Sequence, residues 1–200
     1  MTVQEIKISK ALQKGIKFSC QQCGACCKGL DEGEVYLYYD DIVRLANYLN
    51  FRGEIGLRTF AKKYLKTVND SFFWKDSEHP HGKTYRFKTL AFKFKGQDER
   101  CYFLKRNKCT VYEARPFQCR CFPFWRMMVE SKVNIIDYSK KCPGLRASLD
   151  NIGKHYSKQK ILKWAKKELE IEVKYFLKMK ENNFDILKVY PFLPKDFLKN

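Results

Sequence analysis

Residues 20–27 read Cys20-Gln21-Gln22-Cys23-Gly24-Ala25-Cys26-Cys27, so four of these eight residues are cysteines. Thiols this close together either form disulfides or hold a metal. Two adjacent cysteines seldom pair with each other, because the bridge strains the peptide between them. We therefore interpret this stretch, called the knuckle below, as a set of metal ligands, with Gly24 helping the chain to turn so that the thiols converge.

The cysteine content of the whole chain supports a metal rather than disulfides. The chain has 200 residues and nine cysteines, an odd number that leaves at least one thiol unpaired. The first 17 residues contain no apolar segment of a secretory signal, and no apolar run is long enough to span a membrane. We expect a cytoplasmic protein without a transmembrane segment, whose thiols stay reduced and available to metals.

Five further cysteines follow in the second half of the chain. Cys101 and Cys109 flank Lys105-Arg106-Asn107-Lys108, a spacing typical of a tight hairpin that brings two thiols together. The others are Cys119, Cys121 and Cys142.

The order of these motifs resembles the YkgJ-type cysteine-cluster family. The resemblance rests on Cys-x2-Cys-Gly-x-Cys-Cys, on Cys-x-Phe-Leu and Cys-x-Val-Tyr-Glu-x-Arg-Pro-x-x-Cys-Arg-x-Phe-Pro-Phe, and on a final Cys-x-Gly, over about residues 18–145. The resemblance implies a domain that chelates zinc or iron. Members of this family were formerly also described as Fe–S oxidoreductases. The matching cysteines, and thus the implied metal ligands, are Cys20, Cys23, Cys26, Cys27, Cys101, Cys109, Cys119 and Cys142.

Eight thiolates suit two four-ligand sites, or one cluster and one mononuclear ion. Thiolate-rich sites select zinc or Fe–S clusters, and the spacing of the knuckle fits both. The adjacent side chains of Cys26 and Cys27 point differently, which suggests that they serve different metals. Cys121 falls at a variable position of the motif and is expected to be a free thiol. His79 and His81 are interpreted as loop residues rather than ligands.

Three functions remain open. The first is a metal-binding module for zinc or iron. The second is an Fe–S redox protein or modification enzyme, since flagellin lysine N-methylases carry a similar cysteine cluster. The third is a nucleic-acid-binding protein with metal knuckles. The chain has no phosphate-binding loop, no dinucleotide fingerprint and no Cys-x3-Cys-x2-Cys run, and no catalytic residue can be assigned.

The net charge of +18 favours acidic proteins or nucleic acids as partners, beside the metal ions themselves. The lysines are spread along the whole chain instead of forming one block. A solvated basic surface therefore explains much of this charge.

The apolar patterns predict an α+β fold: a small cysteine- and metal-centred domain with an αα-hairpin, short antiparallel strands and a long C-terminal helix. Helices are predicted over 3–12, over 41–49 with an aspartate cap at Asp40 or Asp41, over 54–65, and from 152–157 to 181. Strands are predicted over 35–39, 72–74, 84–94 and 127–138. We expect one cysteine-cluster domain over 1–150, and a basic helix and tail over 151–200 packed on that domain.

Overall fold

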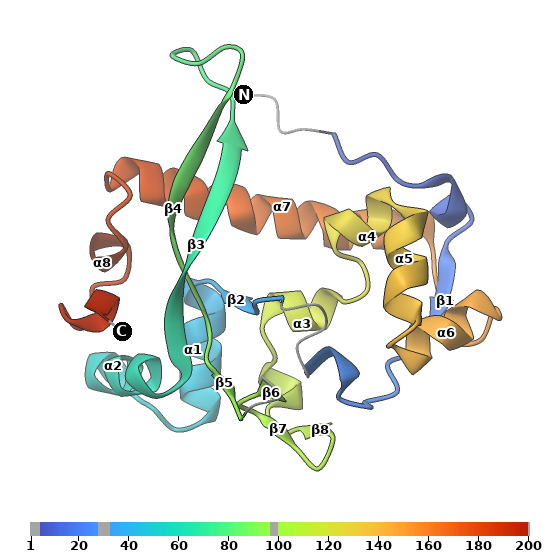
Figure 1. Cartoon of the computed structure of the whole chain (residues 1–200), viewed down its shortest axis with the longest axis horizontal. Coiled ribbons are helices and arrows are strands. Elements are labelled where there is room, and N and C mark those ends of the chain that lie inside the picture. Colours follow the sequence, from blue (N-terminus) through green and yellow to red (C-terminus); the bar gives the residue numbers. More distant parts are fainter. Residues whose placement is uncertain (1–4, 28–32, 97–99, 200) are drawn as a thin grey trace. The chain divides into compact units, whose positions relative to one another are not determined.

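The structure, a computed structural model, describes residues 5–27, 33–96 and 100–199. It is an α+β protein with short antiparallel strands and a long C-terminal helix, as predicted (Figure 1). The chain divides into two compact units. The ribbon unit comprises Val35–Lys93 and Ile171–Asn200, and the cysteine unit comprises Glu5–Glu34 and Phe94–Glu170. The predicted domain boundary at residue 150 stays a prediction.

The ribbon unit contains the predicted αα-hairpin. Its elements are β2 (Tyr36–Leu37), α1 (Tyr39–Tyr48), α2 (Gly53–Tyr64), β3 (Leu65–Trp74), β4 (Lys83–Phe92), the C-terminal part of α7 (Lys158–Glu181), α8 (Ile186–Val189) and a 3-10 turn (Phe197–Lys199). Ile42, Leu45 and Ala46 form the buried stripe of α1. The predicted aspartate cap is wrong: Tyr38 occupies the cap position without a side-chain bond. Asp41 instead lies in the first turn and is paired with Arg44.

Strands β3 and β4 form a long antiparallel ribbon (Figure 1). They pair from Leu65↔Phe92 to Trp74↔Lys83, and β2 adds to the other edge of β4 at Leu37↔Leu90. Because side chains alternate in a strand, one face of the ribbon carries the apolar residues. Phe72, Trp74, Tyr85 and Phe87 on that face all have rings within 6.1 Å of the Phe176 ring of α7. This aromatic cluster is the core of the ribbon unit.

The cysteine unit consists of short elements. It contains a 3-10 turn (Lys10–Leu12), β1 (Ile16–Phe18), a second 3-10 turn (Ala25–Cys27), β5 (Phe94–Lys95), β6 (Arg100–Cys101), β7 (Leu104–Lys105), β8 (Lys108–Cys109), a third 3-10 turn (Tyr112–Ala114), α3 (Phe117–Cys121), α4 (Arg126–Glu130), α5 (Lys132–Ser139), α6 (Pro143–Leu149), β9 (Lys154–Tyr156) and the N-terminal part of α7. Strands β1 and β9 pair antiparallel. The ring of Phe124 packs between those of Phe18 and Tyr156, at centroid distances of 6.4 and 4.8 Å.

Two predicted elements of the cysteine unit are wrong. The segment predicted as a strand over 127–138 forms α4 and α5 instead. Its β-branched residues favour a strand locally, but Ser131 caps α5 by accepting a hydrogen bond from Asn134 N, and Met128, Val129 and Ile135 are buried. In the predicted helix over 3–12, only Lys10–Leu12 forms a helical turn, while Val3 and Gln4 lie outside the described residues.

Helix α7 spans Lys158–Glu181, close to its predicted limits. Its buried positions include Ile161, Ala165, Phe176 and Met179, which recur at helical spacing. Most of its lysines are exposed. Across the described parts of the chain, no helix combines the length and apolar character needed to cross a bilayer.

An ion pair at the end of the ribbon predicts an acid-dependent loss of stability. The Lys180 ammonium binds Asp76 and holds the pKa of that carboxyl at about 2, below its ordinary value of 3.8. A lowered carboxyl pKa stabilises the fold above the ordinary pKa, and this stabilisation disappears as the pH falls through about 2. Asp76→Asn should therefore lower the urea midpoint at pH 6 but have a much smaller effect at pH 2. An equal decrease at both pH values would contradict this assignment.

Candidate metal centre

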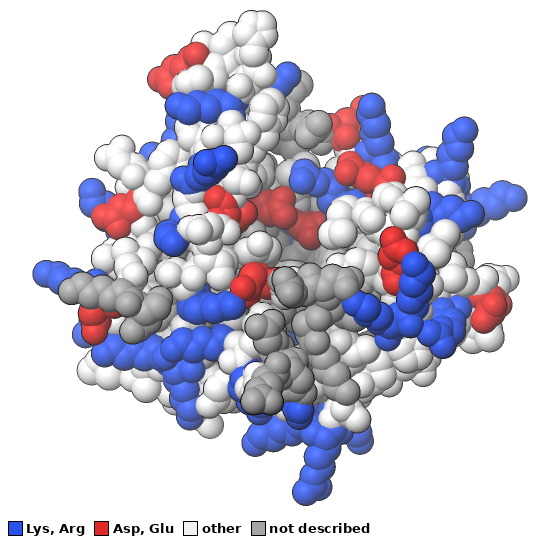
Figure 2. Space-filling model, in the orientation of Figure 1, with Lys and Arg blue, Asp and Glu red and all other residues white. Residues whose placement is uncertain are grey.

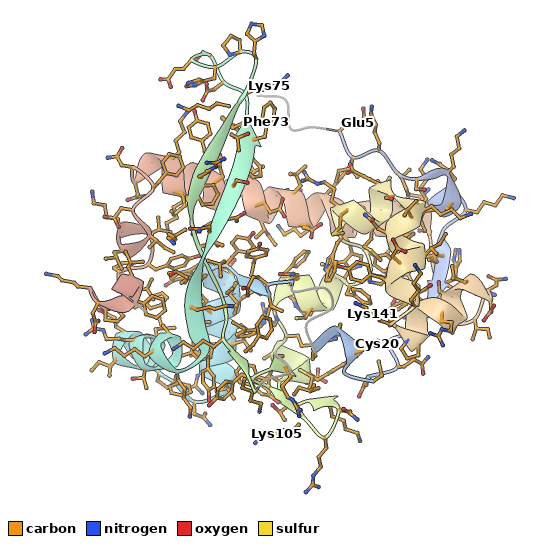
Figure 3. The ribbon with its side chains drawn as sticks, in the orientation of Figure 1. Glu5, Cys20, Phe73, Lys75, Lys105 and Lys141 are labelled. Atoms are coloured by element: carbon orange, nitrogen blue, oxygen red, sulfur yellow. The ribbon has the colours of Figure 1, made fainter. Side chains whose placement is uncertain are left out.

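The knuckle lies in the cysteine unit, in the loop after β1. Cys20, which is labelled in Figure 3, is in irregular backbone. Cys23 is also in irregular backbone, and Cys26 and Cys27 are in the 3-10 turn. Gln22 and Gly24 have φ angles of 49° and 72°, in the left-handed region. These two residues reverse the chain between the cysteines, which is the turn that the glycine predicted.

Gly24 also fixes the knuckle against the hairpin of β7 and β8. A Cβ atom at Gly24 would lie 2.7 Å from Leu104 Cδ1 and 2.9 Å from Asn107 O. The hairpin is the one predicted between Cys101 and Cys109, and it turns at Arg106 and Asn107, whose φ angles are 47° and 61°. The absence of a side chain at Gly24 therefore allows the first group of cysteines to approach the second.

The remaining two candidate ligands belong to short helices. Cys119 lies in α3, which follows Pro116, and Cys142 is the N-cap of α6. Gly144 in the first turn of α6 contacts β1 and the residue after it: a Cβ there would lie 2.6 Å from Ser19 O. This contact holds Cys142 next to the start of the knuckle.

Backbone N–H groups face several of the candidate sulfurs. Hydrogen bonds from Phe103 to Cys101, from Val111 to Cys109 and from Gly144 to Cys142 favour the thiolate in each case. At Cys142 a larger contribution comes from the N–H of Leu145, three residues after the cysteine, whereas each of the other three donors is two residues after its cysteine. Such donors offset negative charge on sulfur, which is the support that a metal-bound thiolate needs.

Cys26 carries the lowest pKa resolved in this set. A hydrogen bond from Cys27 and the charge of Arg115 lower the pKa of Cys26 to about 7, against the opposing effect of burial. The same hydrogen bond, burial and the charges of neighbouring cysteines raise the pKa of Cys27. Cys26 is therefore more readily deprotonated than an ordinary thiol, and Cys27 is the donor that stabilises its thiolate.

The electrostatic influences connect all eight candidate ligands. Burial raises the pKa of Cys101 to about 11 and that of Cys119 well above its ordinary range, and neighbouring thiols add to both effects. The charges of Cys26, Cys101 and Cys119 raise the pKa of Cys27. The charges of Cys26, Cys101 and Cys109 raise the pKa of Cys119. In the same way, the charges of Cys26 and Cys20 raise the pKa of Cys109, and the charges of Cys23 and Cys26 raise the pKa of Cys142. Because this repulsion decays with distance, the eight thiols lie in one neighbourhood.

Cys121 has different surroundings. It is fully buried, its thiol donates to Gln118 O, and its pKa is raised by burial and by Glu168. Trp125 and Arg120 oppose that increase. The groups with the largest effect on Cys121 are thus not cysteines, and its assignment as a free thiol stays a prediction.

The donor set fits a thiophilic metal. It combines eight thiols, backbone N–H donors and the guanidinium of Arg115, which lowers the pKa of Cys26 and opposes the increases at Cys109 and Cys119. No three cysteine sulfurs among the described residues lie within 4.8 Å of one another. Tetrahedral zinc with Zn–S bonds of about 2.3 Å needs sulfurs about 3.8 Å apart. Metal binding would therefore draw the loops inward.

A second group of side chains of the kinds that bind metals lies at the end of the ribbon. Asp76, Glu78 and His79 have their ligand atoms within 4.8 Å of one another, in the hairpin between β3 and β4. Asp76 accepts from His79 N and pairs with Lys180. The lysine ammonium opposes a cation there, so we assign this group to the structure of the hairpin. His79 lies in the loop between β3 and β4, in agreement with its prediction as a loop residue. The sequence does not predict that Asp76 and Glu78 lie beside it.

Arg115 is one of several basic residues close in sequence to the cysteines, and its position before Pro116 predicts an extended residue that bonds backbone carbonyls. Its Nε donates to Tyr112 O, and its guanidinium lies 3.8 Å from the centroid of the Tyr112 ring. These contacts hold the guanidinium where its positive charge lowers the pKa of Cys26. The Arg-Pro pair in the motif was the available signal, since a residue before proline is held extended, and Arg115 has ψ of 143°.

Gly24→Ala tests the packing of the knuckle. Gly53 is a matched control because it also has a positive φ, 63°, but an added Cβ would meet nothing within 4 Å. Gly53→Ala should cost about 1 kcal/mol from backbone strain alone. Gly24→Ala should cost about 1–3 kcal/mol more, because its Cβ clashes with the hairpin, and should also lower the metal content. Urea unfolding measures the difference, and equal effects at both glycines would contradict the packing argument.

A family model named CxxCxxCC and described as "Putative zinc- or iron-chelating domain" matches residues 19–143. The match covers more than half of the chain, including every candidate ligand. No solved structure matches the chain.

Proposed function

The chain belongs to the CxxCxxCC family of zinc- or iron-chelating domains, and we propose that it holds its metal through eight cysteines. These are the four knuckle cysteines together with Cys101, Cys109, Cys119 and Cys142. The observation that carries the proposal is the convergence of the cysteine segments, in which Gly24 packs against Leu104 and Asn107 of the hairpin and Gly144 packs against Ser19. A cytosolic thiol set of this density needs a cation to offset its charge once deprotonated.

We divide the ligands into two sites of four. Cys27, Cys101, Cys109 and Cys119 form the first proposed site, because Cys101 and Cys119 influence Cys27 and Cys109 influences Cys101 and Cys119. Cys20, Cys23, Cys26 and Cys142 form the second, supported by the influence of Cys23 and Cys26 on Cys142. Cys26 also influences Cys101, Cys109 and Cys119, so the two proposed sites lie close together. Cys26 and Cys27 would then bind different metals, and each site would take a tetrahedral ion or a cluster.

Anaerobic purification, metal analysis and a visible absorption spectrum test this function. Two zinc ions per chain in a colourless protein would indicate that the protein chelates zinc, either as its function or to stabilise its fold. Iron and sulfide with a brown colour would assign an Fe–S cluster and favour electron transfer. A protein with neither metal, which also fails to take up zinc or iron after reduction of its thiols, would refute the proposal.

Arg115 should tune the affinity of the site. Arg115→Gln removes a positive charge that favours the thiolate forms of Cys26, Cys109 and Cys119. We expect the pH midpoint of zinc uptake to rise by about one unit, because an adjacent opposite charge shifts a pKa by roughly 1–3 units. A competition titration with a chromophoric chelator across pH measures this midpoint.

Arg106→Gln is the matched control for Arg115→Gln. It removes the same charge from the nearby hairpin turn, but Arg106 is not among the groups that shift the pKa of the cysteines most. Arg115→Lys should restore most of the effect because it keeps the charge. Equal shifts for the Arg115→Gln and Arg106→Gln variants would indicate a general effect of net charge.

A further inference from the structure

The ribbon of β3 and β4 has two faces of opposite character. Phe72, Trp74, Tyr85 and Phe87 lie on the face that packs against α7. Because side chains alternate along a strand, the residues next to them in each strand lie on the other face. Those residues are all exposed, and they form what we call the solvent face: Asn69, Ser71 and Phe73 of β3, and Thr84, Arg86 and Lys88 of β4.

Three cations give the solvent face a positive charge. Arg86 and Lys88 are two residues apart in β4, and Lys75 follows the end of β3. All three are exposed, and none forms an ion pair with any residue that the structure describes. Asp70 is the one acidic residue within β3 and β4, and it lies on the face towards α7, directly opposite Phe87. The solvent face therefore favours an anionic partner.

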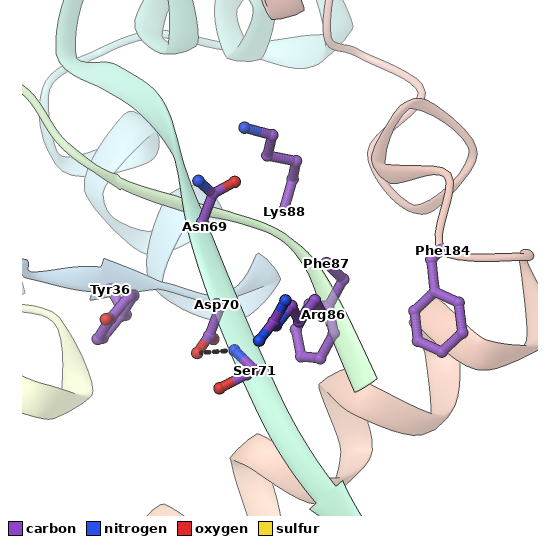
Figure 4. Close-up of a pocket in the computed structure, with 8 residues that line it drawn as sticks. All are labelled: Tyr36, Asn69, Asp70, Ser71, Arg86, Phe87, Lys88 and Phe184. Carbon is purple, nitrogen blue, oxygen red and sulfur yellow. Dashed lines mark hydrogen bonds between the residues drawn. The ribbon is translucent and has the colours of Figure 1, made fainter. Parts of the chain in front are cut away.

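Neutral polar groups lie beside the cations. Asn69 pairs with Lys88, and Ser71 pairs with Arg86 (Figure 4). An amide and a hydroxyl can donate to phosphate oxygens and can accept from sugar hydroxyls or base amino groups. Contacts of this kind to phosphate and sugar position a nucleic acid on a protein without reading its sequence.

Phe73 adds an exposed aromatic ring towards the free end of this face (Figure 3). The residue is 53% exposed although it belongs to a paired strand. The tip of its ring lies on the backbone of Gly82, where an added Cβ would be 2.1 Å from Phe73 Cζ. The Lys75 ammonium is 5.9 Å from the ring centroid, close to the limit of about 6 Å for a cation–π contact. This exposed lysine is free to move to a phosphate while a base stacks on the ring.

We propose that the solvent face binds single-stranded nucleic acid, with Lys75, Arg86 and Lys88 on phosphates and a base stacked on Phe73. A single strand fits better than a duplex because its bases are free to meet the ring. It fits better than an acidic peptide because carboxylates offer no flat ring to Phe73. The proposal is independent of the metal sites, since no cysteine lies on this face.

Fluorescence anisotropy of a labelled oligouridylate of about 12 nucleotides, titrated with the full-length, metal-loaded protein, tests the proposal. We expect saturable binding with a Kd of about 1–100 μM, and a slope of about 2 for log Kd against log salt concentration, as three phosphate contacts to a single strand require. Arg86→Gln should lower this slope by about 0.7 and weaken binding about fivefold. Phe73→Leu should weaken binding about tenfold without changing the slope, because stacking involves no counterion release.

Lys83→Gln is the matched control. Lys83 is an exposed lysine of the same strand β4, but it lies on the opposite face, where its ammonium is 5.2 Å from the centroid of the Tyr85 ring. Its substitution removes the same charge as Arg86→Gln and should leave both the affinity and the slope unchanged.

Three results would overturn the proposal. These are no saturable binding of the oligouridylate, equal effects of Lys83→Gln and Arg86→Gln, and binding of duplex RNA or of polyglutamate as tightly as the single strand. The variants should keep the metal content and the circular dichroism spectrum of the parent, so failure of this proposal is distinguishable from failure of the metal proposal.

Discussion

Removing the metal from the loaded protein with a strong chelator should lower its thermal unfolding midpoint by about 10–20 °C. The cysteine unit has little regular structure around its candidate ligands, since β5, β6, β7 and β8 have two residues each. A structural zinc site contributes about 10–16 kcal/mol in isolated peptides. If about 5 kcal/mol of that stabilises this larger protein, which also has a hydrophobic core, a shift of about 2–4 °C per kcal/mol gives the expected decrease.

The loss of stability after metal removal should be largest in the cysteine unit. Hydrogen exchange of the metal-free protein should increase in Glu5–Glu34 and Phe94–Glu170, and change less in Val35–Lys93, whose aromatic core contains no candidate ligand. Re-addition of zinc or iron should restore both the midpoint and the protection. An unchanged midpoint after complete removal of metal would contradict a structural role for the centre.

Cys27→Ser should remove about half of the bound metal, and Cys26→Ser should remove the other half. This follows from the proposed division, in which the two adjacent cysteines belong to different sites. Serine is a poor ligand for a thiophilic metal, so each substitution leaves its site with three thiolates. Metal analysis of the purified variants measures the loss directly.

Double variants make the test of this division sharper. Cys27→Ser with Cys119→Ser should lose no more metal than either single variant, because both act on one site. Cys27→Ser with Cys142→Ser should lose nearly all of it. Cys121→Ser is the matched control: Cys121 is buried and two residues from Cys119, and the substitution should leave the metal content unchanged. Complete loss of metal in both single variants, Cys26→Ser and Cys27→Ser, would contradict the division.

Outside the solvent face of the ribbon, the surface offers little support for the predicted acidic or nucleic-acid partners. Figure 2 shows lysine and arginine side chains scattered over the viewed face, with acidic residues between them. Phe73 and Lys75 lie towards the free end of the ribbon, where the lysine ammonium is 5.9 Å from the ring centroid (Figure 3). A dispersed basic surface agrees with the interpretation that much of the charge is simply solvated.

The sequence by itself determined the features that depend on local spacing. The knuckle, the hairpin between Cys101 and Cys109, α1, α2 and α7 follow from turn residues and apolar periods that act over a few residues. The family relationship follows from the same spacing. The segment over 127–138 was mistaken for a strand because its β-branched residues favour one locally, whereas burial of Met128 and Val129 favours the observed helices.

Only the tertiary structure decided which charges and donors surround each thiol. The influence of Arg115 on Cys26, the contact of Gly24 with Asn107 and the approach of Gly144 to Ser19 join residues that are far apart in the sequence or lie on different elements. Electrostatic and packing energies depend on distances in space, so a pattern along the chain cannot specify them.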